Sequence, residues 1–121
     1  MLSCVIVDDN GAFLEAASGL LQREGVIVAG VASTTAEALR LTEALRPDVV
    51  LVDVMLGSES GLDLARRLAR GSSGARVILT STHAEADLAE LIADSPAIGF
   101  VPKSRLSAAE VERLVGASRG T

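Results

Sequence analysis

The chain has few of the residues that build cross-links and aromatic cores. Its 121 residues include one cysteine, two phenylalanines, no tryptophan and no tyrosine. A single cysteine excludes an internal disulfide, and because Cys4 lies in an apolar run, we expect a small buried residue in a reducing compartment. With only Phe13 and Phe100 as aromatic residues, the core must consist of Val, Leu, Ile and Ala. That composition is typical of strands buried between helices.

Clustered positive charge and long apolar runs are also missing. The formal net charge is −5, which argues against direct binding to nucleic acid, since phosphate backbones are bound by clustered Lys and Arg. No apolar run approaches the roughly 18 residues that cross a bilayer, and the first residues do not resemble a signal peptide. We therefore expect a soluble, cytoplasmic protein that binds neither nucleic acid nor membrane.

Five short apolar runs rich in β-branched residues alternate with stretches whose apolar residues recur three and four positions apart, the spacing of one helical face. The runs are Cys4 to Val7, Val26 to Val31, Val49 to Val52, Val77 to Leu79 and Ile98 to Val101. Thr34 with Glu37 and Ser107 with Glu110 match the capping box that starts a helix. This alternation predicts an α/β fold, a parallel sheet with helices on both faces.

The length fits one domain, residues 1–121. The last expected helix runs from about Ser107 to Val115 and is followed only by GASRGT. We therefore expect no output domain in this chain.

Charged residues follow three of the expected strands. Asp8 and Asp9 come after the first strand, Asp53 after the third and Lys103, the one lysine of the chain, after the fifth. Ligands of open parallel sheets bind beyond these carboxyl ends. Three neighbouring carboxylates repel one another, so we expect a divalent cation there, and Mg²⁺ suits such a site. Alternatively, Asp8 and Asp9 could cap the first helix and occupy its first turn.

Four segments in this order and spacing carry a resemblance to a known family: VDDN (7–10), VVLVD (49–53), TST (80–82) and FVPK (100–103). Gly61 follows Asp53 by eight residues. The chain resembles, over essentially its whole length, the receiver domain of two-component response regulators. The resemblance implies a flavodoxin-like five-stranded parallel sheet of order 2-1-3-4-5 with five helices.

The resemblance also implies a role for each charged residue. Asp53 would be the phosphoacceptor, which becomes an aspartyl phosphate. Asp9 would bind Mg²⁺ directly and Asp8 through water, and Asp53 and the main-chain carbonyl of Met55 would complete the ligands. Lys103 would contact the phosphoryl group. The donor would be a histidine kinase, a histidine phosphotransfer protein or a small acyl phosphate.

Ser81, which lies 22 residues before Lys103, matches the family's switch hydroxyl, and Thr80 is the alternative. Phe100 matches the family's aromatic switch position, although an ordinary core aromatic is the alternative. The resemblance places the output surface at about Glu85 to Val115, for a downstream target protein or a phosphorylation-dependent homodimer.

The resemblance further implies that the kinase docks on the first helix, about Gly11 to Leu21. We expect the domain to catalyse its own phosphorylation and dephosphorylation, with no turnover of an external substrate.

The sequence departs from the family pattern at several positions. Gly57 stands where proline is frequent, and Ser104 replaces the proline that often follows the lysine. We therefore do not expect a cis bond after Lys103, since without proline it would cost about 2.5 to 4 kcal/mol. Met55 is expected to shield the aspartyl phosphate from water, and His83 is expected to be a solvated loop residue.

Two other functions remain open. A phosphatase of the haloacid dehalogenase type also forms an aspartyl phosphate, but it needs an acidic residue two positions on, where this chain has Met55. A receiver-like interaction module that is never phosphorylated usually loses an acidic residue or the lysine. This chain keeps all of them.

Overall fold

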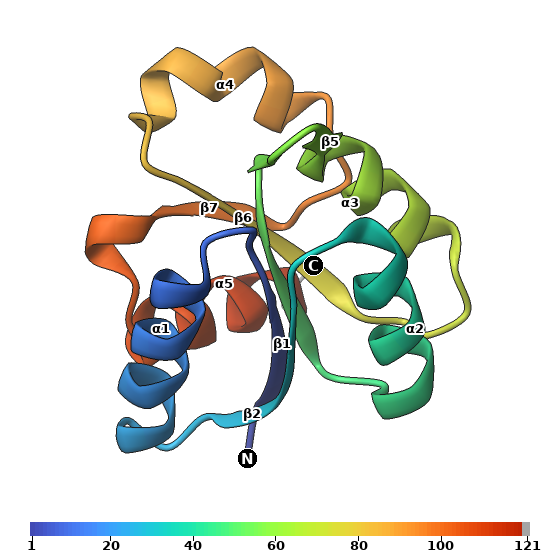
Figure 1. Ribbon diagram of the computed structural model, residues 1–121. Coiled ribbons are helices and arrows are strands. Elements are labelled where there is room, and N and C mark those ends of the chain that lie inside the picture. The colour runs from blue at the N-terminus through green and yellow to red at the C-terminus, as the bar shows by residue number, and fades with distance from the viewer. Residues whose placement is uncertain (120–121) are drawn as a thin grey trace.

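The computed structural model describes residues 1–119 and shows a central sheet between two layers of helices (Figure 1). The main strands are β1 (Ser3–Val7), β2 (Ile27–Ala32), β3 (Val49–Asp53), β6 (Arg76–Ser81) and β7 (Gly99–Pro102). They pair in parallel in the order β2-β1-β3-β6-β7. The predicted flavodoxin-like fold is confirmed, and every expected strand end lies within two residues of the observed one. The predicted domain extends to residue 121, and residues 120–121 lie outside the described range.

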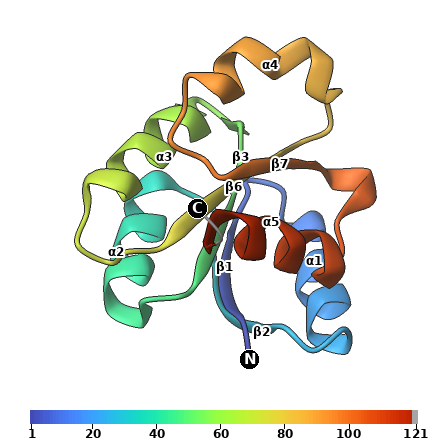
Figure 2. The same ribbon diagram turned by 180° about the vertical axis from the view of Figure 1, so that it is seen from behind.

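Five α-helices cover the two faces of the sheet. They are α1 (Gly11–Arg23), α2 (Thr35–Leu45), α3 (Gly61–Arg70), α4 (Glu85–Ala93) and α5 (Ala108–Arg119), and a 3₁₀ turn, η1 (Lys103–Arg105), follows β7. Helices α1 and α5 cover one face, and α2 and α3 cover the other, with α4 beyond them (Figures 1 and 2). Within residues 1–119, no helix combines the length and the apolar character that a membrane span requires.

Helix α1 is capped by Asn10. Its side-chain Oδ1 accepts a hydrogen bond of 3.1 Å from the N–H of Phe13, which satisfies one of the free donors of the first turn. Asp8 and Asp9 therefore do not cap the helix. Their carboxylates need another explanation.

Both predicted capping residues form their hydroxyl bond. The N–H of Glu37 donates to Thr34 Oγ1 at 3.2 Å, and the N–H of Glu110 donates to Ser107 Oγ at 3.1 Å. The glutamate carboxylates do not form the second hydrogen bond of a capping box, which would be to the N–H of the capping residue. That of Glu37 accepts from the N–H of the residue before the cap, and that of Glu110 binds Arg113 one turn later. One half of each box thus matches the prediction.

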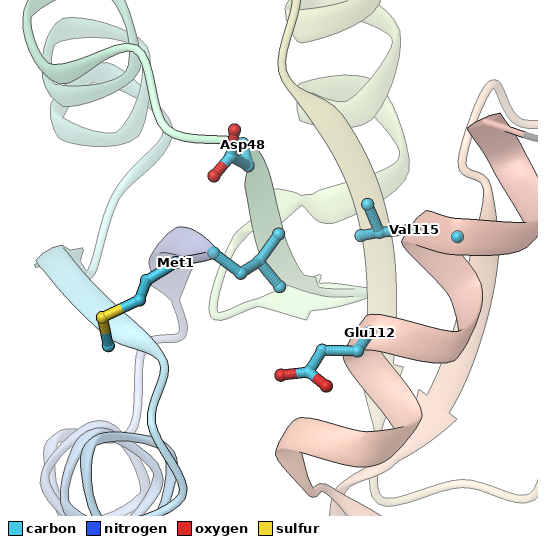
Figure 3. Close-up of a pocket in the computed structure, with 6 residues that line it drawn as sticks. Met1, Asp48, Glu112 and Val115 are labelled. Carbon is cyan, nitrogen blue, oxygen red and sulfur yellow. The ribbon is translucent and has the colours of Figure 1, made fainter.

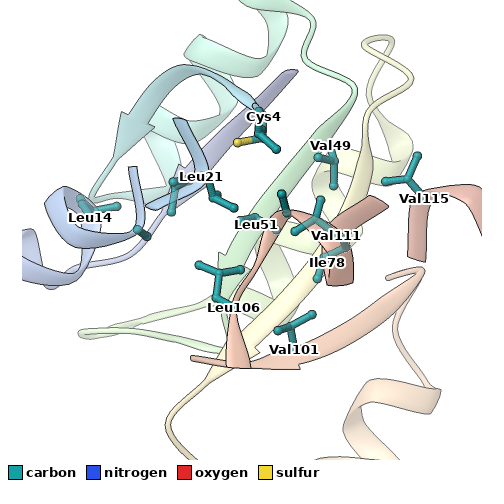
Figure 4. Packing of buried hydrophobic residues seen from close by; sticks show 14 residues of the cluster. Cys4, Leu14, Leu21, Val49, Leu51, Ile78, Val101, Leu106, Val111 and Val115 are labelled. Carbon is teal, nitrogen blue, oxygen red and sulfur yellow. The ribbon is translucent and has the colours of Figure 1, made fainter. Parts of the chain in front are cut away.

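Two apolar clusters fill the space between the sheet and the helices. Figure 4 shows the cluster beneath α1 and α5, where Leu21 and Val111 pack against the strand residues Leu51 and Ile78. Cys4 is fully buried there, and burial raises the pKa of its thiol to about 12. The second cluster lies beneath α2 and α3 and includes Phe100. These layers leave only the strand ends open for a site.

A small hairpin that the sequence does not reveal connects β3 to α3. It pairs β4 (Met55–Leu56) with β5 (Glu59–Ser60) in antiparallel fashion. Gly57 turns the chain with a φ of 61°, which proline cannot adopt, so the departure from the family pattern has a structural reason. None of the peptide bonds in residues 1–119 is cis, as expected for the bond after Lys103.

Candidate functional site

The three predicted carboxylates meet at the carboxyl ends of β1 and β3. One oxygen from each of Asp8, Asp9 and Asp53 lies within 4.8 Å of the others. Asp8 is fully buried, Asp53 is nearly so, and Asp9 is exposed. The cluster is therefore anchored in the protein on one side and open to a ligand on the other.

Lys103 bridges two of these carboxylates. Its Nζ lies 2.6 Å from Asp8 Oδ2 and 2.9 Å from Asp53 Oδ2, and its side chain is only 13% exposed. Burial alone would lower the pKa of Lys103, but the contacts with the two carboxylates and their negative charges raise it above its ordinary value. Lys103 is therefore charged at neutral pH and connects the end of β7 to those of β1 and β3.

The cluster retains unsatisfied negative charge. Asp8 Oδ1 accepts a 2.9 Å hydrogen bond from the N–H of Asn10. Asp8 Oδ2 has its ion pair with Lys103 but, alone among the buried side-chain polar atoms of residues 1–118, no well-aligned hydrogen bond. Three carboxylates and one ammonium leave two negative charges, which a divalent cation would balance. These oxygens therefore fit Mg²⁺, which is commonly bound by one or two carboxylates together with water and phosphate oxygens.

The turn after β3 holds Asp53 in place. Asp53 Oδ1 accepts from the N–H of Met55 at 3.1 Å, and the N–H of Val54 donates to the carbonyl of Thr80 at 2.9 Å. Gly61 packs directly against this turn, since a Cβ at that position would lie 1.8 Å from the carbonyl oxygen of Asp53. The spacing of Gly61 from Asp53 therefore reflects close contact between the first turn of α3 and the end of β3.

The two candidate hydroxyls lie on opposite faces of the sheet. Thr80 pairs in register with Asp53, and Ser81 follows it, so its side chain points to the other face. Ser81 Oγ accepts from the N–H of His83 at 3.0 Å and lies 3.3 Å from His83 Nδ1. His83 is exposed, as predicted, yet it holds the Ser81 hydroxyl. No pattern in the sequence predicts this contact.

A groove of about 440 Å³ runs beside Asp53, between the β4–β5 hairpin and α4. Met55, Leu62, Leu88 and Leu91 supply its apolar lining, and Ser81 is among its polar residues. None of the residues of α4 is buried. Helix α4 is therefore the least tightly packed helix next to the carboxylates.

A second pocket lies at the opposite, amino ends of the strands (Figure 3). It has a volume of about 460 Å³ and is lined by Met1, Leu2, Asp48, Glu112, Val115 and Gly116. The Asp48 carboxylate already accepts from the N–H of Ser3 at 2.9 Å, which ties β1 to the start of β3. This pocket contains no cluster comparable to that of the carboxylates, which remain the candidate site.

The sequence and the fold of this chain match those of known proteins. Residues 4–114 match the family described as the response regulator receiver domain. The response regulator GacA of Pseudomonas aeruginosa is 29% identical over 120 residues, which cover 98% of this chain and 54% of GacA. The transcriptional regulatory protein LiaR of Bacillus subtilis is 25% identical over 127 residues, covering 99% of this chain and 57% of LiaR. The chain thus spans about half the length of these relatives.

Solved structures agree with the topology. The signal receiver domain of NarL from Mycobacterium tuberculosis superposes with a TM-score of 0.84 at 29% identity, covering 99% of this chain and 98% of that one. A CheY-like receiver domain protein from Methanospirillum hungatei gives a TM-score of 0.81 at 22% identity, covering 100% and 99%. At that identity the second comparison shows the fold alone.

Proposed function

Because the chain belongs to the response regulator receiver domain family of two-component signalling, we propose that Asp53 accepts a phosphoryl group and that the domain switches its surface in response. The observation that carries the proposal is the Lys103 ammonium, which bridges Asp8 and Asp53 inside a cluster of three carboxylates. This largely buried lysine lies at the end of a strand, beside the carboxylate that would attack phosphorus. Its ammonium could therefore bind an oxygen of the phosphoryl group on Asp53.

The acidic cluster would hold Mg²⁺. Asp9 and Asp53 would bind it directly and Asp8 through water, and the main-chain carbonyl of Met55 would complete the protein's ligands. The hydrogen bond from the Met55 N–H to Asp53 keeps that stretch of main chain beside the cluster. When bound, the ion neutralises phosphoryl charge and aligns donor and acceptor, which is most of what phosphoryl transfer requires.

In the proposed reaction, a carboxylate oxygen of Asp53 attacks the phosphorus atom. The new P–O bond forms as the P–N bond of a phosphohistidine breaks and the imidazole leaves with the electron pair. Lys103 then exchanges its contact with Asp53 Oδ2 for one with a phosphoryl oxygen. The Ser81 hydroxyl breaks its contact with His83 and donates a hydrogen bond to a second phosphoryl oxygen. The donor would be a histidine kinase, a histidine phosphotransfer protein or a small acyl phosphate, and a kinase would dock on α1.

The aspartyl phosphate carries about −1.5 to −2 units of charge in place of the single negative charge of the Asp53 carboxylate, so the negative charge of the cluster increases by roughly 0.5 to 1 unit. Movement of Ser81 would pull on the segment that leads into α4, and Phe100 would repack beneath it. Because α4 buries none of its residues, little packing opposes its displacement. The altered surface of α4, β7 and α5 would then bind a downstream target protein or a second copy of this chain.

Incubation with acetyl phosphate and Mg²⁺, followed by intact-mass measurement, tests the proposal. The wild type should gain about 80 Da, the mass of a phosphoryl group, and should not gain it when EDTA is present. Asp53→Asn should show no gain, whereas Asp63→Asn, a matched change at an exposed aspartate of α3, should behave as the wild type. If the wild type takes up no phosphoryl group from acetyl phosphate or a kinase, the phosphorylation-independent interaction module becomes the better account.

A further inference from the structure

The Lys103 ammonium has a third neighbour besides the two carboxylates. Its Nζ lies 4.5 Å from the centroid of the Phe13 ring, in the cation–π range. Phe13 belongs to the first turn of α1, ninety residues away in the chain, and is only partly buried. The helical spacing of α1 alone indicates a core residue. The ammonium over its ring indicates a second role.

The loop that carries Asp8 and Asp9 also holds the main chain of Phe13. The N–H of Asn10 donates to Asp8 Oδ1 at 2.9 Å, and Asn10 Oδ1 accepts from the N–H of Phe13 at 3.1 Å. The main chain of Phe13 is therefore linked by two hydrogen bonds to the buried Asp8. These two bonds set the position of the Phe13 main chain relative to Asp8, and from there the ring reaches the Lys103 ammonium.

The ring suits an ammonium that must remain available to oxygen ligands. Lys103 has three N–H donors, and the carboxylates of Asp8 and Asp53 can take two. A phenyl face attracts the positive charge but offers no oxygen that would fix the third donor in place. It also limits the many rotamers of the lysine stem, whose ordering otherwise costs conformational entropy.

We propose that Phe13 is a positioning residue, whose ring holds the Lys103 ammonium against Asp8 and Asp53 so that it meets the incoming phosphoryl group. This inference rests on the proposed function for its consequence, but the placement itself can be measured without any phosphoryl donor. A leucine would fill much of the same apolar space without attracting the charge. Tyrosine keeps the aromatic face.

Because Lys103 is the only lysine, lysine labelled with ¹³C and ¹⁵N gives a single set of side-chain signals in NMR spectra of the untagged chain. The ring current of Phe13 should shift the resonances of the Lys103 ε-methylene group and ammonium away from their ordinary positions. Phe13→Leu should move them back, and Phe13→Tyr should keep them near the wild-type values. Wild-type resonances at ordinary positions, or resonances unchanged in Phe13→Leu, would overturn the proposal.

The consequence for the reaction is measured by the initial rate of phosphorylation with acetyl phosphate and saturating Mg²⁺. Phe13→Leu should lower the rate about two- to thirty-fold, the range that corresponds to exposed through desolvated cation–π contacts. Phe13→Tyr should restore the rate to near that of the wild type. Phenylalanines with one, two and three fluorine atoms at position 13 should lower it stepwise, because fluorine weakens the ring's attraction for a cation at nearly constant shape.

Thermal unfolding of each variant separates a loss of positioning from a loss of fold. A rate in Phe13→Leu equal to that of the wild type, or a fluorine series without a trend, would contradict the role in the reaction. If the wild type accepts no phosphoryl group at all, the proposed function fails. The NMR comparison then still decides whether Phe13 positions Lys103.

Discussion

Replacing Gly61 with alanine tests the closest packing contact at the site. Gly61 is the first residue of α3, and a Cβ there would lie 1.8 Å from the Asp53 carbonyl oxygen and 2.8 Å from its carbonyl carbon. Cβ atoms essentially never approach other atoms closer than 3.0 Å, so α3 and the end of β3 must separate by at least 1.2 Å. Both partners are main chain, and no side-chain rotation can relieve the contact.

The expected cost follows from two opposing effects. Alanine favours a helix over glycine by up to about 1 kcal/mol. Overpacking of a well-packed site costs about 1 to 3 kcal/mol and occasionally more, and a contact between two main-chain segments lies at the upper end. We expect Gly61→Ala to lower the free energy of unfolding by about 2 to 4 kcal/mol, which a domain of typical stability, about 5 to 15 kcal/mol, survives.

Gly11 provides a matched control. It is the first residue of α1, follows a capping residue as Gly61 does, and a Cβ there would meet no atom within 4 Å. Gly11→Ala should leave the stability unchanged or raise it by up to about 1 kcal/mol. Urea unfolding monitored by circular dichroism measures both variants. Equal stabilities of Gly61→Ala and Gly11→Ala would refute the reasoning.

Three further predictions concern charge, burial and the lifetime of the phosphoryl group. Lys103→Met should lower the free energy of unfolding in EDTA by about 3 kcal/mol, because it leaves a buried carboxylate unpaired. Folding raises the pKa of Lys103, so this difference should be constant from neutral pH to roughly pH 10.4 and shrink as the pH rises through the folded-state pKa. A difference that persists unchanged at higher pH would count against it. Cys4, buried and with its pKa raised to about 12, should react with Ellman's reagent at pH 8 only after unfolding. Its contribution to stability should decline as the pH rises above roughly 8.5, and rapid reaction of the native protein would contradict this account. Met55→Asn should speed dephosphorylation by replacing an exposed apolar side chain beside Asp53 with a polar one that admits water. An unchanged rate would end the shielding hypothesis.

The sequence was sufficient to predict the strands and the meeting of the carboxylates. Apolar β-branched runs mark buried strands wherever they occur, and the carboxyl ends of parallel strands share one edge of the sheet. The sequence therefore predicts that Asp8, Asp9 and Asp53 lie together. Only the family resemblance predicts the strand order, because alternation of strands and helices alone does not determine which strands are neighbours.

Side-chain contacts across the fold could not be predicted in this way. Phe13 lies on the apolar face of α1, and its spacing does not distinguish a core residue from one that faces an ammonium. The contact between Ser81 and His83 depends on the direction of a loop after β6. The hairpin around Gly57 has strands of two residues, too short for any periodicity to appear.

The capping residues show which hydrogen bonds a local sequence pattern can predict. Ser107 and Thr34 bind the expected N–H groups because that geometry is set within one turn of helix. The carboxylate of Glu110 has a choice between the helix start and Arg113, and it binds the arginine. Where a side chain has competing partners, the sequence pattern predicts the possible partners but not which of them the side chain binds.

The central claim is that Asp53 carries the phosphoryl group, and chemical localisation tests it most directly. Reduction of the acetyl phosphate-treated protein with borohydride converts an aspartyl phosphate to homoserine, which peptide mass spectrometry assigns to a single position. The account predicts homoserine at position 53 and at neither Asp8 nor Asp9, with none in untreated protein. Homoserine at another aspartate, or at no position in a protein whose mass has increased, would contradict it.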